Sequence, residues 1–95
     1  MTREIGDNSR IKKTDNHVET MVDDEIVLMH IDNGKFFSLS NTGRKAWELL
    51  EEHSSLGALV AAIRAEYDVP EETCRSELLA MLAKLEERTL IEIVD

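Results

Sequence analysis

Apolar and polar positions in the first half of the chain predict three short strands. The runs occupy residues 17–22, 25–31 and 34–39. Val18, Thr20 and Val22 alternate with other residues in the first run, and this period of two is typical of a strand. The second run is rich in β-branched and long apolar residues, and Asp23-Asp24 supplies turn chemistry between the two. We therefore expect a small sheet at the start of the fold.

Asn33-Gly34 is the strongest local signal in the sequence. Asn-Gly at the centre of a two-residue hairpin supplies the two positive φ angles of a type I′ turn. Such a turn places Asp32 opposite Lys35 and Leu28 opposite Leu39, and it pairs opposite charges across the strands. One face of the hairpin then carries Ile26, Leu28, His30, Phe37 and Leu39, and the other carries Val27, Met29, Ile31, Phe36 and Ser38.

Both of these faces are largely apolar, whereas a half-solvated antiparallel sheet alternates apolar with polar residues. We therefore expect the second face to be covered. The candidates are the N-terminal arm, the C-terminal segment, a second protomer and a ligand.

After Leu39 the apolar positions change to helical spacing and predict three helices, ending near residues 53, 67 and 88. Ser40 or Asn41 suits the cap of the first helix, and Ser55 the cap of the second. Residues 90–94 have the composition of a short strand. The expected fold class is α+β, a three-stranded antiparallel sheet followed by a three-helix bundle, similar to a winged helix-turn-helix.

Residues 1–16 are polar and aperiodic, which predicts a flexible N-terminal arm before a single domain of residues 17–95. The chain has 20 acidic and 11 basic residues and a formal charge of −9. This charge disfavours nucleic acid, whose binding is dominated by neutralising phosphates. No apolar run reaches the length of a membrane span, and the single cysteine, Cys74, favours a reducing, cytoplasmic compartment.

The residues that commonly carry chemistry are scattered. His17, His30, His53 and Cys74 lie on four different predicted elements and show no metal-ligand spacing. Cys74 falls on the core stripe of the third helix, which indicates a buried thiol rather than a nucleophile. No glycine-rich phosphate loop occurs. We therefore expect no enzyme activity, no metal and no cofactor.

The remaining feature is the strand of residues 34–39, which ends the sheet. A last strand has an open edge, a row of unmet N–H and C=O groups to which an extended peptide can add. Leu79 lies outside the core stripe of the third helix and widens its apolar face, whereas the flank with Glu77, Lys84 and Arg88 is charged. A winged-helix DNA-binding regulator and a structural adaptor or homodimer are the alternatives.

The sequence resembles the PqqD-like family of stand-alone RiPP recognition elements, which includes the PqqD peptide chaperone and the B1 proteins of lasso peptide biosynthesis. The resemblance covers about residues 17–94 and rests on Gly34-Lys35-Phe36-Phe37-Ser38-Leu39, Thr42-Gly43 and Trp47-Glu48-Leu49-Leu50. It implies a non-catalytic protein that binds the leader segment of a ribosomally made precursor peptide. It also implies presentation of that peptide to a maturation enzyme, a leader peptidase or a radical SAM enzyme.

The resemblance further implies that the leader adds beside the third strand, against the third helix. The expected contacts on the strand are Lys35, Phe36, Phe37, Ser38 and Leu39. On the helix we expect the Leu79 flank to contribute Arg75, Leu78, Leu79, Leu82, Ala83 and Glu86. Two features depart from the family: Thr89 stands where Gly is frequent, which predicts a different exit from the helix, and the 16-residue extension is absent from the shortest members.

Overall fold

The computed structural model describes residues 6 and 8–94. In chain order the elements are β1 (Arg10–Lys13), β2 (His17–Val22), β3 (Glu25–His30), β4 (Phe36–Leu39), α1 (Asn41–Leu49), α2 (Leu56–Glu66), α3 (Glu71–Glu87) and β5 (Ile91–Val94). Strands β2, β3 and β4 form an antiparallel sheet in that order, and β1 pairs with β5 in a separate two-stranded sheet. The predicted α+β class, with three strands followed by three helices, is confirmed.

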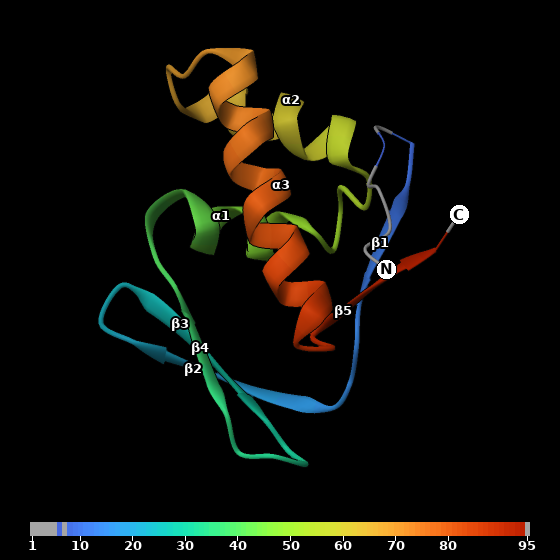
Figure 1. The fold of residues 1–95 in the computed structure, drawn as a ribbon. Helices are drawn as coiled ribbons and strands as arrows, with labels where there is room; N and C mark the ends of the chain where they lie inside the picture. The colour runs from blue at the N-terminus through green and yellow to red at the C-terminus, as the bar shows by residue number, and fades with distance from the viewer. Residues whose placement is uncertain (1–5, 7, 95) are drawn as a thin grey trace.

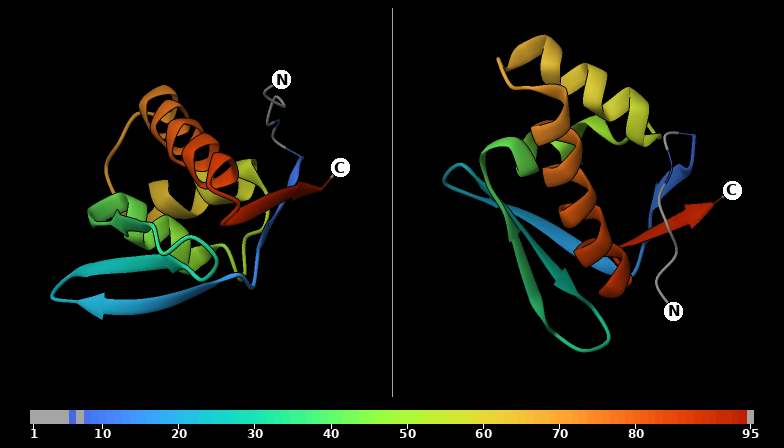
Figure 2. Two further views of the ribbon diagram at one scale, coloured as in Figure 1. Left: turned by 60° about the horizontal axis from the view of Figure 1, so that its bottom comes forward. Right: turned by 45° about the horizontal axis from the view of Figure 1, so that its top comes forward.

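All three helices lie on one side of the β2-β3-β4 sheet, and the β1–β5 pair lies at the edge of the helical layer (Figures 1 and 2). The core fills the space between these layers. The sheet contributes Leu28 and Leu39, α1 contributes Trp47, and α3 contributes Leu82 and Leu85, all of them buried. The Ser55 side chain accepts a hydrogen bond from the Ala58 N–H, as expected for the cap of α2.

The hairpin between β3 and β4 has a different turn from the one predicted. Gly34 is the only residue of the pair with a positive φ, at 69°, so the two positive angles of a type I′ turn are not present. Residues 31–34 form a longer loop, closed by the His30 N–H donating to the Lys35 C=O at 2.9 Å. Asn33 contributes through its side chain, since its Oδ1 accepts from the Lys35 N–H at 2.9 Å.

This loop moves the register by two residues, so that Leu28 lies opposite Phe37 and Ile26 opposite Leu39. A shift of two residues leaves every side chain on its original face, whereas a shift of one residue would exchange the faces. The predicted cross-strand pairs were therefore wrong, but the predicted faces are correct.

One face of the sheet packs on the helices, and the other is open. Val18, Val22 and Phe36 are exposed on that second face, Phe36 to 65%. Val27 and Met29 of the same face are half-buried. The described arm residues and the C-terminal strand lie elsewhere, in the β1–β5 pair, so they are not the cover that the sequence led us to expect.

Residues 10–13 belong to the folded domain, in contrast to the flexible arm predicted for 1–16. They form β1, which pairs with β5 so that Ile11 lies opposite Ile93. The Ile11 side chain is buried and 2% exposed, and its N–H donates to the Ser54 carbonyl at 2.6 Å. Residues 1–5 and 7 of the predicted arm lie outside the described residues.

We expect Ile11→Ala to lower the free energy of unfolding by about 2–4 kcal/mol, because it removes a buried side chain and leaves a cavity. Denaturant unfolding followed by circular dichroism measures this change. Lys12→Ala is the matched control, because Lys12 is the exposed neighbour on the same strand. Equal midpoints for the two variants would mean that β1 adds nothing to stability.

Candidate functional site

The free edge of β4 is the first component of the site. β4 pairs with β3 on one side, and no other described strand lies along its second side. Backbone groups of an antiparallel strand point alternately toward and away from the partner strand. Because the Lys35 carbonyl accepts from His30, Phe37 also directs its N–H and C=O at β3. Phe36 and Ser38 therefore direct theirs outward, to the open edge.

A groove between β4 and α3 is the second component. It consists of two adjoining cavities, of about 520 and 340 Å³, which share Phe37 and Lys84 in their walls. The first lies near the β3–β4 loop and the end of α3, and the second lies near the end of β4 and the middle of α3. All five strand residues expected at the site line the groove: Lys35, Phe36, Phe37, Ser38 and Leu39.

The flank of α3 beside β4 is the charged one, not the Leu79 flank expected from the sequence. The α3 residues that line the groove are Glu77, Leu78, Ala80, Met81, Lys84 and Glu87, followed by Arg88. Only Leu78 was expected there. Long charged side chains form such walls through their apolar stems while the charge stays in water. A helical wheel shows which residues of α3 share a flank, but it does not show which flank lies beside β4.

The other expected α3 residues have different surroundings. Leu82 is fully buried in the core, and Leu79 is partly buried and packs against it. The Arg75 guanidinium pairs with the Glu71 carboxylate at 3.6 Å, one turn earlier on the same helix. Ala83 and Glu86 are half-buried and do not line either cavity beside β4.

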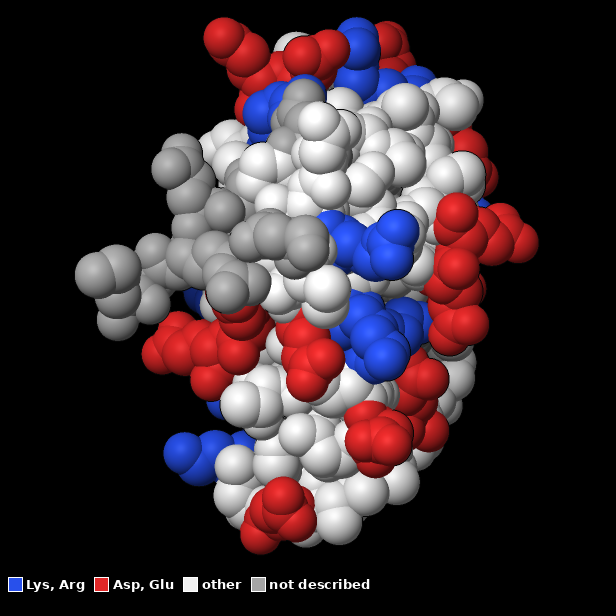
Figure 3. Space-filling model, turned by 90° about the vertical axis from the view of Figure 1, so that its right-hand side faces the viewer, with Lys and Arg blue, Asp and Glu red and all other residues white. Residues whose placement is uncertain are grey.

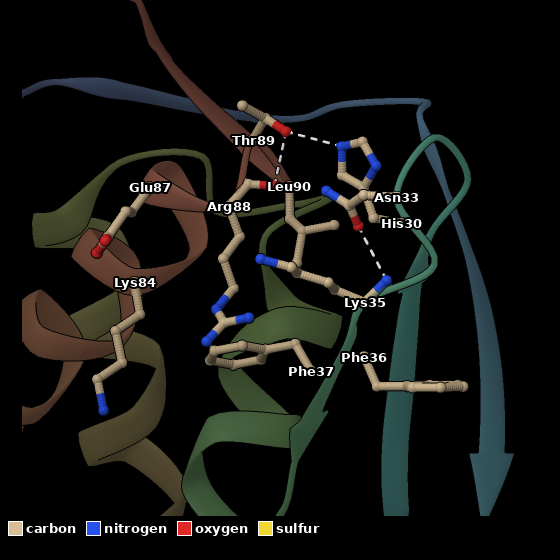
Figure 4. Close-up of a pocket in the computed structure, with 10 residues that line it drawn as sticks. All are labelled: His30, Asn33, Lys35, Phe36, Phe37, Lys84, Glu87, Arg88, Thr89 and Leu90. Atoms are coloured by element: carbon tan, nitrogen blue, oxygen red, sulfur yellow. Dashed lines mark hydrogen bonds between the residues drawn. The ribbon is translucent and has the colours of Figure 1, made fainter.

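The two halves of the groove differ in character. Near the middle of α3 the walls include the apolar side chains of Leu39, Leu78 and Met81, with Glu77 and Lys84 beside them. The Met81 sulfur lies so close to Gly43 that a Cβ there would be 3.4 Å away. At the other end the Arg88 guanidinium lies over the Phe37 ring, 5.3 Å from its centroid, a distance typical of a cation–π contact. Lys35 extends across this end in the direction of Arg88 (Figure 4).

Thr89 closes the basic end of the groove and holds an unusual backbone. Its φ is 57°, a left-handed conformation that is unfavourable for a β-branched residue. The Thr89 N–H donates to the Glu86 carbonyl and the Leu90 N–H to the Leu85 carbonyl, which together form a Schellman motif. Thr89 thus takes the left-handed conformation that glycine commonly adopts just after the C-terminus of a helix. Its hydroxyl lies 2.9 Å from His30 Nε2.

The described residues contain no group of three or more His, Cys, Asp or Glu that could hold a metal ion. No helix within the described part of the chain has the length and apolarity to cross a bilayer. On the side that carries β1 and β5, Lys and Arg side chains gather near the middle and Asp and Glu surround them (Figure 3). This mixed surface differs from the continuous basic face that duplex binding uses.

Cys74 is a core residue with 2% exposure, and burial raises the pKa of its thiol. A raised pKa lowers the thiolate fraction at neutral pH, and thiolate is the reactive form. We expect an aromatic disulfide reagent to label Cys74 slowly in the native protein and rapidly in denaturant, with a native rate that increases with pH. Immediate labelling of the native protein would contradict the buried position.

An open strand edge beside a helix, with a groove between them, is a geometry in an α+β domain to which an extended peptide can add as a strand. The family described as Coenzyme PQQ synthesis protein D (PqqD) matches residues 25–91. The chain therefore belongs to the PqqD family.

Two solved structures resemble the chain with a TM-score of 0.77 each. One is TbiB1 in complex with the TbiA(beta) leader peptide, 38% identical, covering 85% of this chain and 94% of its own. The other is a lasso peptide synthetase B1 complexed with its leader peptide, which at 17% identity supports the fold alone and covers 87% of this chain and 98% of its own. A comparison with curated proteins gave no match.

Proposed function

We propose that this protein binds the leader segment of a ribosomally synthesised precursor peptide and presents it to a maturation enzyme. The observation that carries the proposal is the 38% identity to TbiB1, whose structure holds a leader peptide. The open edge of β4 and the groove beside it supply a physical basis for the same activity here.

The leader binds as an additional strand beside β4. Its backbone pairs with the outward N–H and C=O groups of Phe36 and Ser38, and its side chains point alternately into the groove and to the open face. Each such hydrogen bond contributes about 0.5–1.5 kcal/mol net. Backbone pairing therefore supplies part of the affinity, and the side chains that enter the groove supply the rest together with the specificity.

The protein has no reaction of its own in this proposal. It holds the leader so that the modifiable part of the precursor extends to the maturation enzyme. That enzyme is a leader peptidase in a lasso-type pathway or a radical SAM enzyme in a PqqD-type pathway. Sequencing the neighbouring genes would identify that enzyme: a short precursor gene beside a peptidase and a cyclase would indicate the lasso-type pathway, and one beside a radical enzyme the PqqD-type pathway.

The open second face of the sheet favours a role for a further contact, with the maturation enzyme or with a second copy of this chain. Val18, Val22 and Phe36 would be buried by it. Solution mass measurement on the isolated protein separates the two, since a homodimer has twice the mass without any enzyme present.

Isothermal titration with the synthetic leader of the neighbouring precursor gene tests the proposal. Saturable binding of one peptide per chain is expected, and a scrambled peptide of equal composition is the control. If the scrambled peptide binds equally, or if only duplex DNA binds and does so with strong salt dependence, leader recognition is not the function.

A further inference from the structure

We propose that the peptide bound at β4 carries an Asp or Glu side chain at the basic end of the groove. We further propose that this side chain stands two or four residues from an apolar side chain seated against Leu39 and Met81. This inference rests on the proposed function and adds the chemical class of peptide that the site selects.

The basic end of the groove carries cations without an acidic partner. Lys35, Lys84 and Arg88 line the first cavity, and among the described residues none of them forms an ion pair with a carboxylate. Five cations elsewhere in the described residues do pair with carboxylates, namely Lys13, Arg44, Lys45, Arg64 and Arg75. A chain with 20 acidic residues has ample carboxylates for such pairs, so their absence in the groove leaves a site for an external anion.

The carboxylate that lines this cavity does not fill this role. Glu87 lines the same cavity and stands three residues after Lys84, a spacing that permits an ion pair on a helix. In Figure 4 its carboxylate points away from Lys35 and Arg88. Lys35, from the β4 side, and Arg88, at the end of α3, therefore approach one another across the cavity. A carboxylate between them removes their mutual repulsion and gains charge-assisted hydrogen bonds.

Stabilisation of the helix end is not a sufficient explanation for these cations. Lys84 lies in the last turn of α3, where positive charge offsets the negative end of the helix dipole. That effect does not explain why Lys35 lies in the groove, because Lys35 comes from the β4 side and is not part of the helix. It also gives no reason for Arg88 to lie over the Phe37 ring. Both observations are consistent with a site that faces the groove.

Strand geometry gives the spacing of the two anchors. Side chains on one face of a strand recur at every second residue. On the face of β4 toward α3 these are Lys35, Phe37 and Leu39, by their pairing with the buried side of β3. A peptide residue opposite Leu39 meets Leu78 and Met81, and the residue two positions along, opposite Phe37, meets Lys84 and Arg88. The peptide residue four positions from the one opposite Leu39 meets Lys35.

A display library of random peptides, about 12 residues long so as to exceed a usual strand, tests the inference on the full-length protein. We expect selected peptides to contain Asp or Glu two or four residues from a large apolar residue. Arg88→Glu and Lys84→Glu should lose this preference. Lys12→Glu is the control, because it makes the same charge change at an exposed position on β1 that lines neither cavity of the groove.

Affinities of one selected peptide and its Asp→Asn variant complete the test. On the wild-type protein the Asn variant should bind at least about tenfold more weakly, as for loss of a charge-assisted hydrogen bond. On Arg88→Glu the two peptides should differ by less than about threefold, which is the signature of a direct pair. On Lys12→Glu the wild-type ratio should persist.

The outcomes separate the inference from the proposed function. Peptides that compete for the groove but show no acidic preference overturn this inference and leave leader binding intact. A library from which no groove-binding peptide is selected contradicts both. An oligothymidylate that displaces the acidic peptide at equal concentration overturns the inference in favour of a general phosphate site.

Discussion

Ser38→Pro should weaken leader binding at least about tenfold and leave the fold intact. Proline has no N–H, and its ring fills the space along the open edge where the added strand must approach. The Ser38 N–H points away from β3, so its removal breaks no hydrogen bond within the sheet, and proline is tolerated on edge strands for this reason. The variant loses one hydrogen bond to the leader, and its ring prevents the added strand from approaching closely. Together these two effects account for the expected loss of affinity.

Ser38→Ala is the matched control, because it removes the hydroxyl and keeps the N–H. We expect it to bind the leader as the unchanged protein does. Titration calorimetry gives the affinities, and thermal unfolding of both variants shows whether the sheet is retained. A folded Ser38→Pro variant with unchanged affinity would mean that the peptide does not pair with β4.

Leu82→Ala should lower the free energy of unfolding by about 2–5 kcal/mol, the usual cost of removing a buried leucine side chain. Leu82 is 0% exposed and packs in the core beneath the sheet. The stability of a domain of this size is itself only about 5–15 kcal/mol, so the loss is a large fraction of the total. Denaturant unfolding followed by Trp47 fluorescence measures it.

Lys84→Ala serves as the comparison, two residues along the same helix and exposed on the groove side. Its stability should change by less than about 0.5 kcal/mol, while leader binding weakens. The pair of variants therefore distinguishes the core side of α3 from its groove side. A stable Leu82→Ala protein that has lost leader binding would place Leu82 in the groove, as the sequence had suggested.

The strands and helices could be predicted because the signals for them are local. Alternation within β2 and β3 and the helical spacing after Leu39 reflect which side chains must reach the core. The faces of β3 and β4 also follow from this alternation. The predicted register was wrong by two residues, and a shift of two residues leaves each side chain on the same face. The Asn33-Gly34 signal indicated a turn correctly but not its type, since Asn33 does not have the positive φ of a type I′ turn and its side chain instead accepts from the Lys35 N–H.

Features that depend on contacts between distant segments could not be predicted in this way. β1 has only Ile11 as an apolar anchor, and its strand forms because β5, some eighty residues later, supplies the partner. The groove flank of α3 depends on how that helix crosses the sheet, which its own apolar pattern does not specify. Lys84 and Arg88 were recognised as a charged flank and were not expected at the site, although they line one end of the groove.

Amide hydrogen exchange at β4, followed by NMR, tests the central claim most directly. In the free protein the Phe37 and Leu39 amides, which face β3, should exchange slowly, and the outward Phe36 and Ser38 amides should exchange rapidly. Saturating leader peptide should slow Phe36 and Ser38 and shift the resonances of Lys84 and Arg88 beside them. Peptide binding that leaves the Phe36 and Ser38 amides rapidly exchanging would contradict strand addition at β4.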